Sequence, residues 1–310
     1  MVNGIGNDDR KIHCEFFYNG FTSKPLWLRD VSRMPTPTAS PTAPDTSTVA
    51  VFVPMSNRKY LTPEEEISFR HLVHFLGKYD KYLVVPQSLD IHYPGFELLR
   101  FSNNFFGSHE ANTRLMLSRK LYSAFGKYKY ILAYQLDCLV FSDQLMEWCN
   151  LDVDYIGAPW IPCSDSPWVK SPHVGNGGFS LRKVESFLRV LDSKEYWQDP
   201  DEYWQRFCSL RSKPIQYLNI PRKYLARLRA LNSVRQHLRK NYPKYEDRFW
   251  SLEASKYYPG FNIAPVETAL RFSFEVAPRL CFDLNHQELP FGCHAWHRYD
   301  RAFWEPYLLP

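Results

Sequence analysis

The apolar run YILAYQLDCLVF contains two polar side chains, Gln135 and Asp137, that could bind a cation. A carboxylate near the end of a buried strand is costly unless a metal, an arginine or backbone N–H groups compensate its charge. Residues two apart in a strand point to the same face, so both side chains could reach one ion or its bound waters. The alternative is a structural Asp137 that caps a turn or pairs with a buried arginine.

A second candidate is a glycine-rich stretch that follows the motif DYIGAPW. It consists of Gly175, Asn176, Gly177 and Gly178. Three glycines around an asparagine, before a helix expected to begin near Leu181, predict a tight backbone whose N–H groups are available to a ligand's oxygen atoms. A tight turn without function gives the same pattern, and it is the position downstream of the acidic strand end that favours a binding loop.

Two further motifs contain groups that could transfer a proton or bind a metal. Glu246 and Asp247 are adjacent acids among aromatic residues. Their repulsion in a partly apolar setting raises one pKa and suits a general base, although an acidic first helical turn looks the same. In PFGCHAWH, His294 or His297 could be a metal ligand, or a packed and hydrogen-bonded histidine.

Apolar runs that alternate with helical patterns supply the elements to position these groups. Thr62, Pro63 and the acids that follow are a start signal for the first helix. We expect strands at 49–54, 82–86, 97–101 and 130–141, and helices at 67–76, 111–125, 182–192 and 224–240. This alternation predicts an α/β fold with a mostly parallel sheet flanked by helices, which binds ligands at the carboxyl ends of its strands.

The composition indicates a globular protein. Its 310 residues are 45% hydrophobic, and a net charge of +5 over this length does not indicate nucleic acid binding. Seven scattered cysteines without a CxxC pair indicate neither a disulfide framework nor a zinc site, and fit a reducing compartment. Without a signal pattern or a membrane-length apolar run, we expect a cytoplasmic protein, possible contact with a membrane surface aside.

The domain organisation follows from a change in composition. Residues 34–48, MPTPTASPTAPDTST, are typical of a Pro/Thr-rich linker. They separate an N-terminal segment of unclear role, residues 1–33, from a single domain at 49–310. We expect the second half of that domain to form the acceptor side of the same cleft.

A basic stretch lies within the second half. It contains Arg222, Lys223, Arg227, Arg229, Arg235, Arg239 and Lys240. Such a stretch, residues 222–240, could meet an anionic lipid carrier or a membrane surface. A solvated helix face is the alternative.

Taken in order, the motifs YQLD…LVF, DYIGAPW, GNGGFSLR, ED and PFGCHAW resemble a little-characterised family of GT-A-like glycosyltransferase domains from bacteria and fungi. The resemblance spans roughly Val49 to Trp296. It implies transfer of a sugar from a UDP- or GDP-sugar to a hydroxyl of a glycan or glycolipid, as in polysaccharide biosynthesis.

The resemblance also implies roles for individual residues. Asp137 matches the last acid of the motif that holds Mn²⁺ or Mg²⁺, with Gln135 in place of the first acid, and His294 occupies the place of a histidine that completes the metal shell in some relatives. The GNGG loop would line the donor sugar, and Arg58, just after the first strand, could bind a phosphate of the donor or be a solvated surface residue.

In the same way, Glu246 and Asp247 would lie near the acceptor, with Asp247 as the base. Attack opposite the leaving group would invert the anomeric carbon. Two other functions stay open: a sugar-nucleotide nucleotidyltransferase or hydrolase, which needs no acceptor base, and a non-catalytic carbohydrate-binding module. The feature that favours the module is Gln135.

Overall fold

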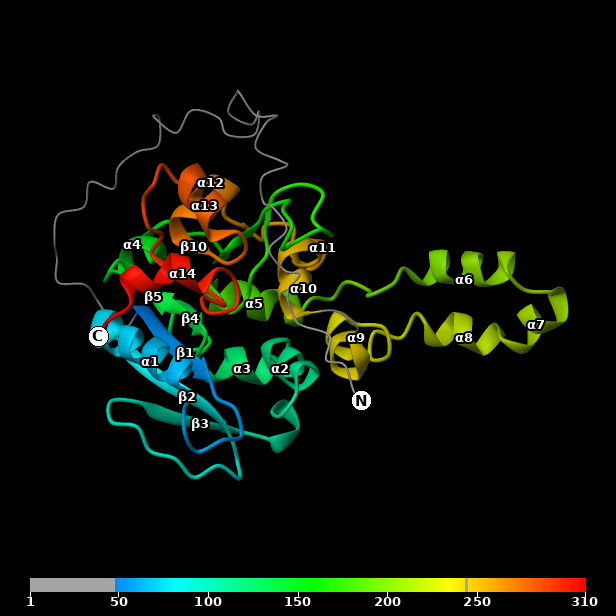
Figure 1. Ribbon diagram of the computed structural model, residues 1–310. Helices are drawn as coiled ribbons and strands as arrows, with labels where there is room; N and C mark the ends of the chain where they lie inside the picture. Colours follow the sequence, from blue (N-terminus) through cyan, green and yellow to red (C-terminus); the bar gives the residue numbers. More distant parts are fainter. Residues whose placement is uncertain (1–47, 243–244) are drawn as a thin grey trace, which may run out of the picture. The chain divides into compact units, whose positions relative to one another are not determined.

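The computed structural model describes residues 48–242 and 245–310 (Figure 1). The described residues all belong to one compact unit, which lies within residues 41–310. The expected N-terminal segment, residues 1–33, lies outside the described residues, as does the expected linker apart from Thr48. Both stay predictions.

A six-stranded sheet forms the centre of the described unit, in the order β3-β2-β1-β4-β9-β6. Its strands are β1 (Val49–Pro54), β2 (Asp80–Pro86), β3 (Glu97–Phe101), β4 (Tyr130–Tyr134), β6 (Tyr155–Gly157) and β9 (Phe179–Lys183). The first four strands are parallel to one another, and β9 is antiparallel to both β4 and β6. The predicted α/β fold with a mostly parallel sheet is therefore confirmed.

Two smaller sheets lie beside the central one. The first contains β5 (Leu139–Val140), β10 (Ser273–Phe274) and β11 (Gly292–Cys293), and the second β7 (Pro159–Trp160) and β8 (His173–Val174). In the first sheet, β11 is parallel to β10 and antiparallel to β5. This arrangement brings the C-terminal segment beside the residues that follow β4.

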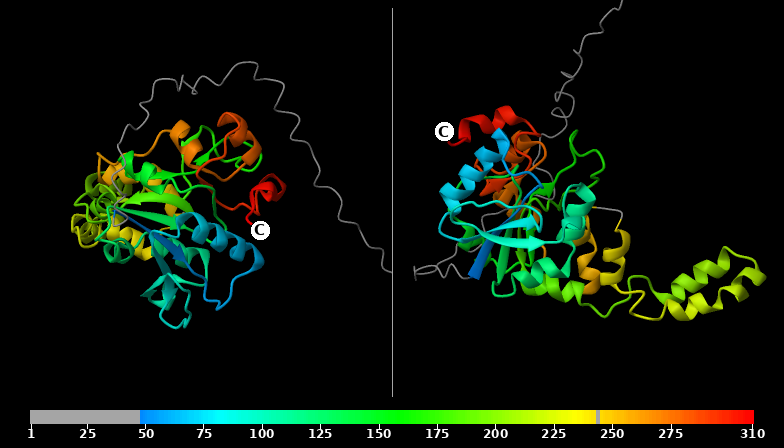
Figure 2. Two further views of the ribbon diagram at one scale, coloured as in Figure 1. Left: turned by 90° about the vertical axis from the view of Figure 1, so that its left-hand side faces the viewer. Right: turned by 90° about the horizontal axis from the view of Figure 1, so that it is seen from below.

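Helices connect and cover the strands (Figures 1 and 2). The helices are α1 (Pro63–Leu76), α2 (His109–Met116), α3 (Arg119–Ala124), α4 (Leu145–Asn150), α5 (Val184–Leu191), α6 (Pro200–Ser209), α7 (Lys213–Leu218), α8 (Ile220–Leu225), α9 (Val234–Asn241), α10 (Glu246–Leu252), α11 (Ala254–Tyr257), α12 (Val266–Phe272), α13 (Pro278–Leu284), α14 (Arg301–Trp304) and the 3-10 turns η4 (Asn103–Phe105) and η5 (Glu305–Tyr307). The predicted start of α1 is confirmed by a capping box between Thr62 and Glu65. Within the described part, none of these helices has the length and apolar composition of a membrane span.

Helices cover both faces of the central sheet. Tyr134 of β4 donates its hydroxyl proton to the carbonyl of Ser68 in α1. Phe52 of β1 packs instead on Phe125, directly after α3, and its register partner on β4 is Ala133. Because successive side chains of a strand point to opposite faces, α1 and α3 lie on opposite sides of the sheet.

Three predicted helices differ from those observed. The helix expected at 111–125 is two helices, because α2 ends at Met116 and Ser118 caps a new helix, α3. The helix expected at 182–192 begins only at Val184, since the preceding residues extend β9. The helix expected at 224–240 is replaced by the end of α8 and most of α9, separated by a turn before the capping residue Ser233.

The strand expected at 130–141 is also interrupted. β4 ends at Tyr134, and a turn follows in which the Cys138 amide donates to the Gln135 carbonyl. The chain then enters β5, in a different sheet. The whole run is apolar because the strands on both sides of the turn are buried.

Candidate active site

The turn after β4 carries the two polar residues of the apolar run. Gln135 and Asp137 lie at the carboxyl end of a central strand, where ligands were expected, but they belong to a turn and not to the strand. Two backbone hydrogen bonds hold the turn: the Gln135 amide donates to the Gly178 carbonyl, and the Trp296 amide donates to the Asp137 carbonyl. These bonds join the turn to the glycine-rich loop and to the C-terminal motif.

His294 joins both side chains of this turn. Its Nε2 lies 3.2 Å from Gln135 Oε1 and 3.2 Å from Asp137 Oδ1. Burial would lower the pKa of His294, but the Asp137 and Glu275 carboxylates raise it well above its ordinary value. The alternative candidate, His297, is exposed to solvent. Two segments that are far apart in the sequence thus meet where Gln135 and Asp137 face the imidazole of His294.

Glu275, which sequence reasoning missed, holds the other side of the ring. Its Oε1 lies 3.0 Å from His294 Nδ1, and its Oε2 accepts a 2.9 Å hydrogen bond from Trp160 Nε1. A carboxylate at Nδ1 holds the ring in the orientation that leaves Nε2 facing Gln135 and Asp137. The signal in the sequence was a lone acid in the apolar segment FSFEVAP.

The GNGG loop is held by the motif that precedes it. The Tyr155 hydroxyl of DYIGAPW donates to the Asn176 carbonyl at 2.7 Å. The Asn176 side-chain oxygen accepts from the amides of Gly178 and Phe179, which directs its amide nitrogen to within 2.8 Å of His294 Nδ1. The two motifs that pointed most strongly to one family are therefore one packed unit.

One expectation for this loop was wrong. The loop precedes a strand, β9, and not a helix N-terminus. The amides of Gly178 and Phe179 are also occupied by Asn176 and are not available to the oxygen atoms of a ligand. The sequence suggested a helix because Leu181 and Arg182 continue into the apolar pattern of α5, whereas pairing with β4 and β6 keeps them extended.

Close packing explains two of the glycines. A Cβ on Gly178 would lie 2.2 Å from His294 Nε2, and a Cβ on Gly177 would lie 2.1 Å from Glu246 Oε1. Neither separation is compatible with van der Waals contact. The loop therefore lies between the histidine cluster and the acidic pair, and it admits no side chain at either position.

Glu246 forms a buried ion pair with Arg182. Their side chains are 7% and 0% exposed, with 3.0 Å between Glu246 Oε1 and Arg182 Nη2. Arg182 also donates to the Gly177 carbonyl at 3.0 Å and to the Tyr122 hydroxyl at 2.9 Å. Glu246 therefore positions the GNGG loop through Arg182, which binds the Gly177 carbonyl.

Asp247, in the first turn of α10, differs from its neighbour. Its side chain is half-buried, and no ion pair neutralises it among the described residues. Burial, with the added charges of Glu246 and Glu275, raises the pKa of Asp247 to about 8. A carboxyl with a raised pKa next to a residue that contacts the GNGG loop is a candidate general base.

Arg58 does not join these residues. It follows the carboxyl end of β1, as expected, and its guanidinium lies 2.7 Å from Glu65 of the α1 capping box. A donor phosphate would have to share Arg58 with that carboxylate.

The cluster around His294 fits a divalent cation. Asp137, Cys138 and His294 each have a potential ligand atom within 4.8 Å of the others. Burial raises the pKa of the Cys138 thiol well above its ordinary value, which makes it a poor ligand for a hard ion. Oxygen atoms of Asp137 and Gln135, with the imidazole nitrogen of His294 once a cation has displaced its Nε2 proton, are suitable donors for Mn²⁺ or Mg²⁺.

The family of the chain follows from a match over residues 95–294 to the family described as "Protein of unknown function (DUF5672)". The chain belongs to this family. The residues of this DUF5672 protein that match include the cluster around His294, the GNGG loop and the acidic pair. Curated proteins gave no match.

Solved structures similar in fold to this DUF5672 protein include several glycosyltransferases. One is the mannosyltransferase Ktr4p from S. cerevisiae, at 10% identity and a TM-score of 0.31 over 52% of this chain. The chain spans 60% of the length of that mannosyltransferase.

Two others cover more of the chain. A glycosyltransferase involved in glycosylation of the major capsid of PBCV-1 has 12% identity and a TM-score of 0.41, over 82% of this chain and 96% of its own. The galactosyltransferase LgtC, solved with donor and acceptor sugar analogs, has 12% identity and a TM-score of 0.43, over 83% and 92%. With likenesses this distant, the activity has to be inferred from the site residues.

Proposed function

We propose that this DUF5672 protein is a glycosyltransferase that moves a sugar from a UDP- or GDP-sugar to a hydroxyl of a glycan or glycolipid. The observation that carries the proposal is the meeting of Gln135, Asp137 and His294 at one point, beside the GNGG loop and at the carboxyl end of β4. In open α/β sheets, ligands bind at this end of the strands.

Asp137, His294 and Gln135 would hold Mn²⁺ or Mg²⁺. Such an ion offsets the negative charge of a departing nucleoside diphosphate. Glu275 keeps the His294 ring in one orientation through Nδ1, so that Nε2 faces the two oxygen ligands. Asn176 holds the loop that would line the donor sugar.

We assign removal of the acceptor's proton to Asp247. As the bond from the anomeric carbon to the diphosphate breaks, the acceptor oxygen bonds to that carbon and its proton passes to the carboxylate. A raised pKa makes Asp247 a stronger base than an ordinary aspartate. Attack from the face opposite the diphosphate would invert the anomeric carbon. Glu246 acts indirectly, by holding Arg182 and the loop.

A screen of nucleotide sugars tests the donor site. Thermal unfolding and donor hydrolysis would be measured with UDP-, GDP- and CMP-sugars, with and without Mn²⁺, on the wild type and Asp137→Ala. A ligand at 100 times its Kd adds about 2.7 kcal/mol, or about 5–10 °C in Tm. We expect one nucleotide to stabilise the wild type only with Mn²⁺, and the exposed control Asp90→Ala to behave like the wild type.

Each of the other outcomes selects a different function. No stabilisation by any nucleotide would contradict the proposed donor site. Metal-dependent donor binding without turnover on any acceptor would favour a carbohydrate-binding module. Turnover that survives Asp247→Asn would favour a sugar-nucleotide nucleotidyltransferase or hydrolase, because neither needs an acceptor base.

A further inference from the structure

A helical hairpin extends away from the central sheet (Figures 1 and 2). It comprises residues 199–232, with α6, α7 and α8, and we call it the arm. Its three helices pack on one another. At its base the Asn232 side chain donates to the Gln198 carbonyl at 2.8 Å, and Arg227 pairs with Asp201. These contacts close the base of the hairpin, while its helices contribute nothing to the site described above.

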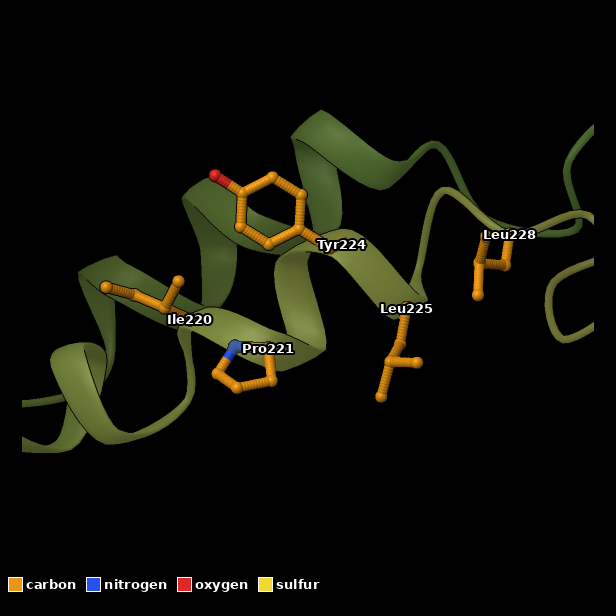
Figure 3. Close-up of a pocket in the computed structure, with 5 residues that line it drawn as sticks. All are labelled: Ile220, Pro221, Tyr224, Leu225 and Leu228. Carbon is orange, nitrogen blue, oxygen red and sulfur yellow. The ribbon is translucent and has the colours of Figure 1, made fainter.

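The arm exposes a large amount of apolar surface. Nine of the 15 exposed large hydrophobic side chains of the described residues lie on it, and Leu218 is 80% exposed. A shallow hollow of about 530 Å³ along α8 is lined by Ile220, Pro221, Tyr224, Leu225 and Leu228. Figure 3 shows Pro221, Leu225 and Leu228 projecting from the same side of this segment. Contiguous apolar surface of this kind marks an interaction site.

The arm is also basic: residues 199–232 contain seven Lys or Arg residues and three acids, and the acids all lie within its first four residues. Residues 203–245 contain eleven Lys or Arg residues and no Asp or Glu. Arg211 and Arg222 are exposed, close in sequence to the exposed Leu210, Tyr217 and Leu225. Long basic side chains beside apolar ones are the combination that lies in the interface of an anionic bilayer, with the charges at the headgroups.

We propose that the arm docks this protein on an anionic membrane surface, with its apolar side chains in the headgroup region and its basic side chains on the lipid phosphates and carboxylates. Charge decides between the possible occupants. A second copy of the arm would bring two strongly basic surfaces together, which is unfavourable. Nucleic acid would pair with the charges but would leave Leu218 and Leu225 in water. An anionic bilayer binds the basic side chains and also covers the apolar ones.

Vesicle co-sedimentation of the full chain tests the proposal. The probes are vesicles of phosphatidylcholine alone and of phosphatidylcholine mixed with phosphatidylserine. We expect binding to the anionic vesicles only, weakened by added salt. Arg211→Glu with Arg222→Glu should weaken binding at least about 25-fold, taking about fivefold for each basic charge lost.

A second variant pair tests the apolar contribution. Leu218→Ser with Leu225→Ser should weaken binding to anionic vesicles at least about tenfold, because two exposed leucines no longer enter the headgroup region. The matched controls are Lys120→Glu with Lys170→Glu, and Val73→Ser with Leu151→Ser, all exposed and outside the arm. Circular dichroism would verify that each variant is folded.

Three results would overturn the proposal. The first is equal binding to neutral and anionic vesicles, or to neither. The second is an arm variant that binds as tightly as its control. The third is occupation of the arm by something else, seen as arm-dependent dimerisation in sedimentation velocity or as binding to an oligonucleotide in preference to vesicles. Nucleotide-sugar binding is measured separately, so this proposal and the proposed activity can fail independently.

Discussion

Two adjacent acids should respond in opposite ways to the loss of their charge. The Glu246 carboxylate compensates Arg182, whose side chain is fully buried. Glu246→Gln keeps the shape and removes the charge, leaving a buried guanidinium without a counter-ion. The neighbouring Asp247 has no such partner, and burial with the charge of Glu246 raises its pKa to about 8. Asp247→Asn should therefore remove an unfavourable charge.

The two substitutions should change the free energy of unfolding by different amounts. Breaking a buried ion pair by removal of one partner costs about 3–5 kcal/mol, or about 6–20 °C in Tm at about 2–4 °C per kcal/mol. For Asp247, the folded-state pKa exceeds the unfolded value of about 3.9, so its ionisation destabilises the fold as pH rises from about 4 to about 8. After a discount for solvent screening, Asp247→Asn should stabilise by about 1–2 kcal/mol at pH 8.

Urea unfolding of the wild type and both variants between pH 5 and pH 9 provides the measurement. Each variant controls for the other, because the residues are adjacent and each substitution exchanges a carboxylate for an amide. The reasoning about Arg182 would be refuted by a Glu246→Gln variant as stable as the wild type. A stability difference between Asp247→Asn and the wild type that does not grow with pH would refute the raised pKa.

Three further predictions concern the site itself. Gly178→Ala should lower the free energy of unfolding by about 1–3 kcal/mol and abolish stabilisation by Mn²⁺, because its Cβ would meet the His294 ring. The control Gly126→Ala, whose Cβ would lie 3.3 Å from its nearest atom, should have neither effect. Thermal shift would measure both effects. Glu275→Gln should weaken Mn²⁺ binding about 10- to 100-fold in calorimetry, since the carboxylate orients His294, and an unchanged affinity would contradict that role. For transfer, kcat/KM should rise with pH to a plateau above about pH 8, because Asp247 must lose its proton to act as base, and a profile flat from pH 6 to pH 9 would exclude it.

The sequence alone predicted four of the six strands of the central sheet, β1 to β4, but not β6 or β9. β1 and β3 have the predicted bounds, and α1 begins at the predicted cap, because these signals are local: continuous apolar runs, and a threonine followed by proline and acids. Composition and order were enough to predict a mostly parallel sheet. Two predicted boundaries were wrong. The strand expected at 130–141 crosses a turn between two buried strands, β4 and β5, and the helix expected at 182–192 begins late because β9 joins directly onto α5.

The sequence also identified most of the polar residues that meet at the carboxyl end of β4, because each is a polar or glycine interruption in an apolar context. It could not show which of them are partners. The approach of His294 to Asp137 and of Glu246 to Arg182 joins residues more than sixty positions apart, and only the packing of the two sheets and of α10 against the loop brings them together. Packing also separated the two acids: Glu246 forms an ion pair with a buried arginine, whereas Asp247, one helical position further on, has no ion-pair partner among the described residues.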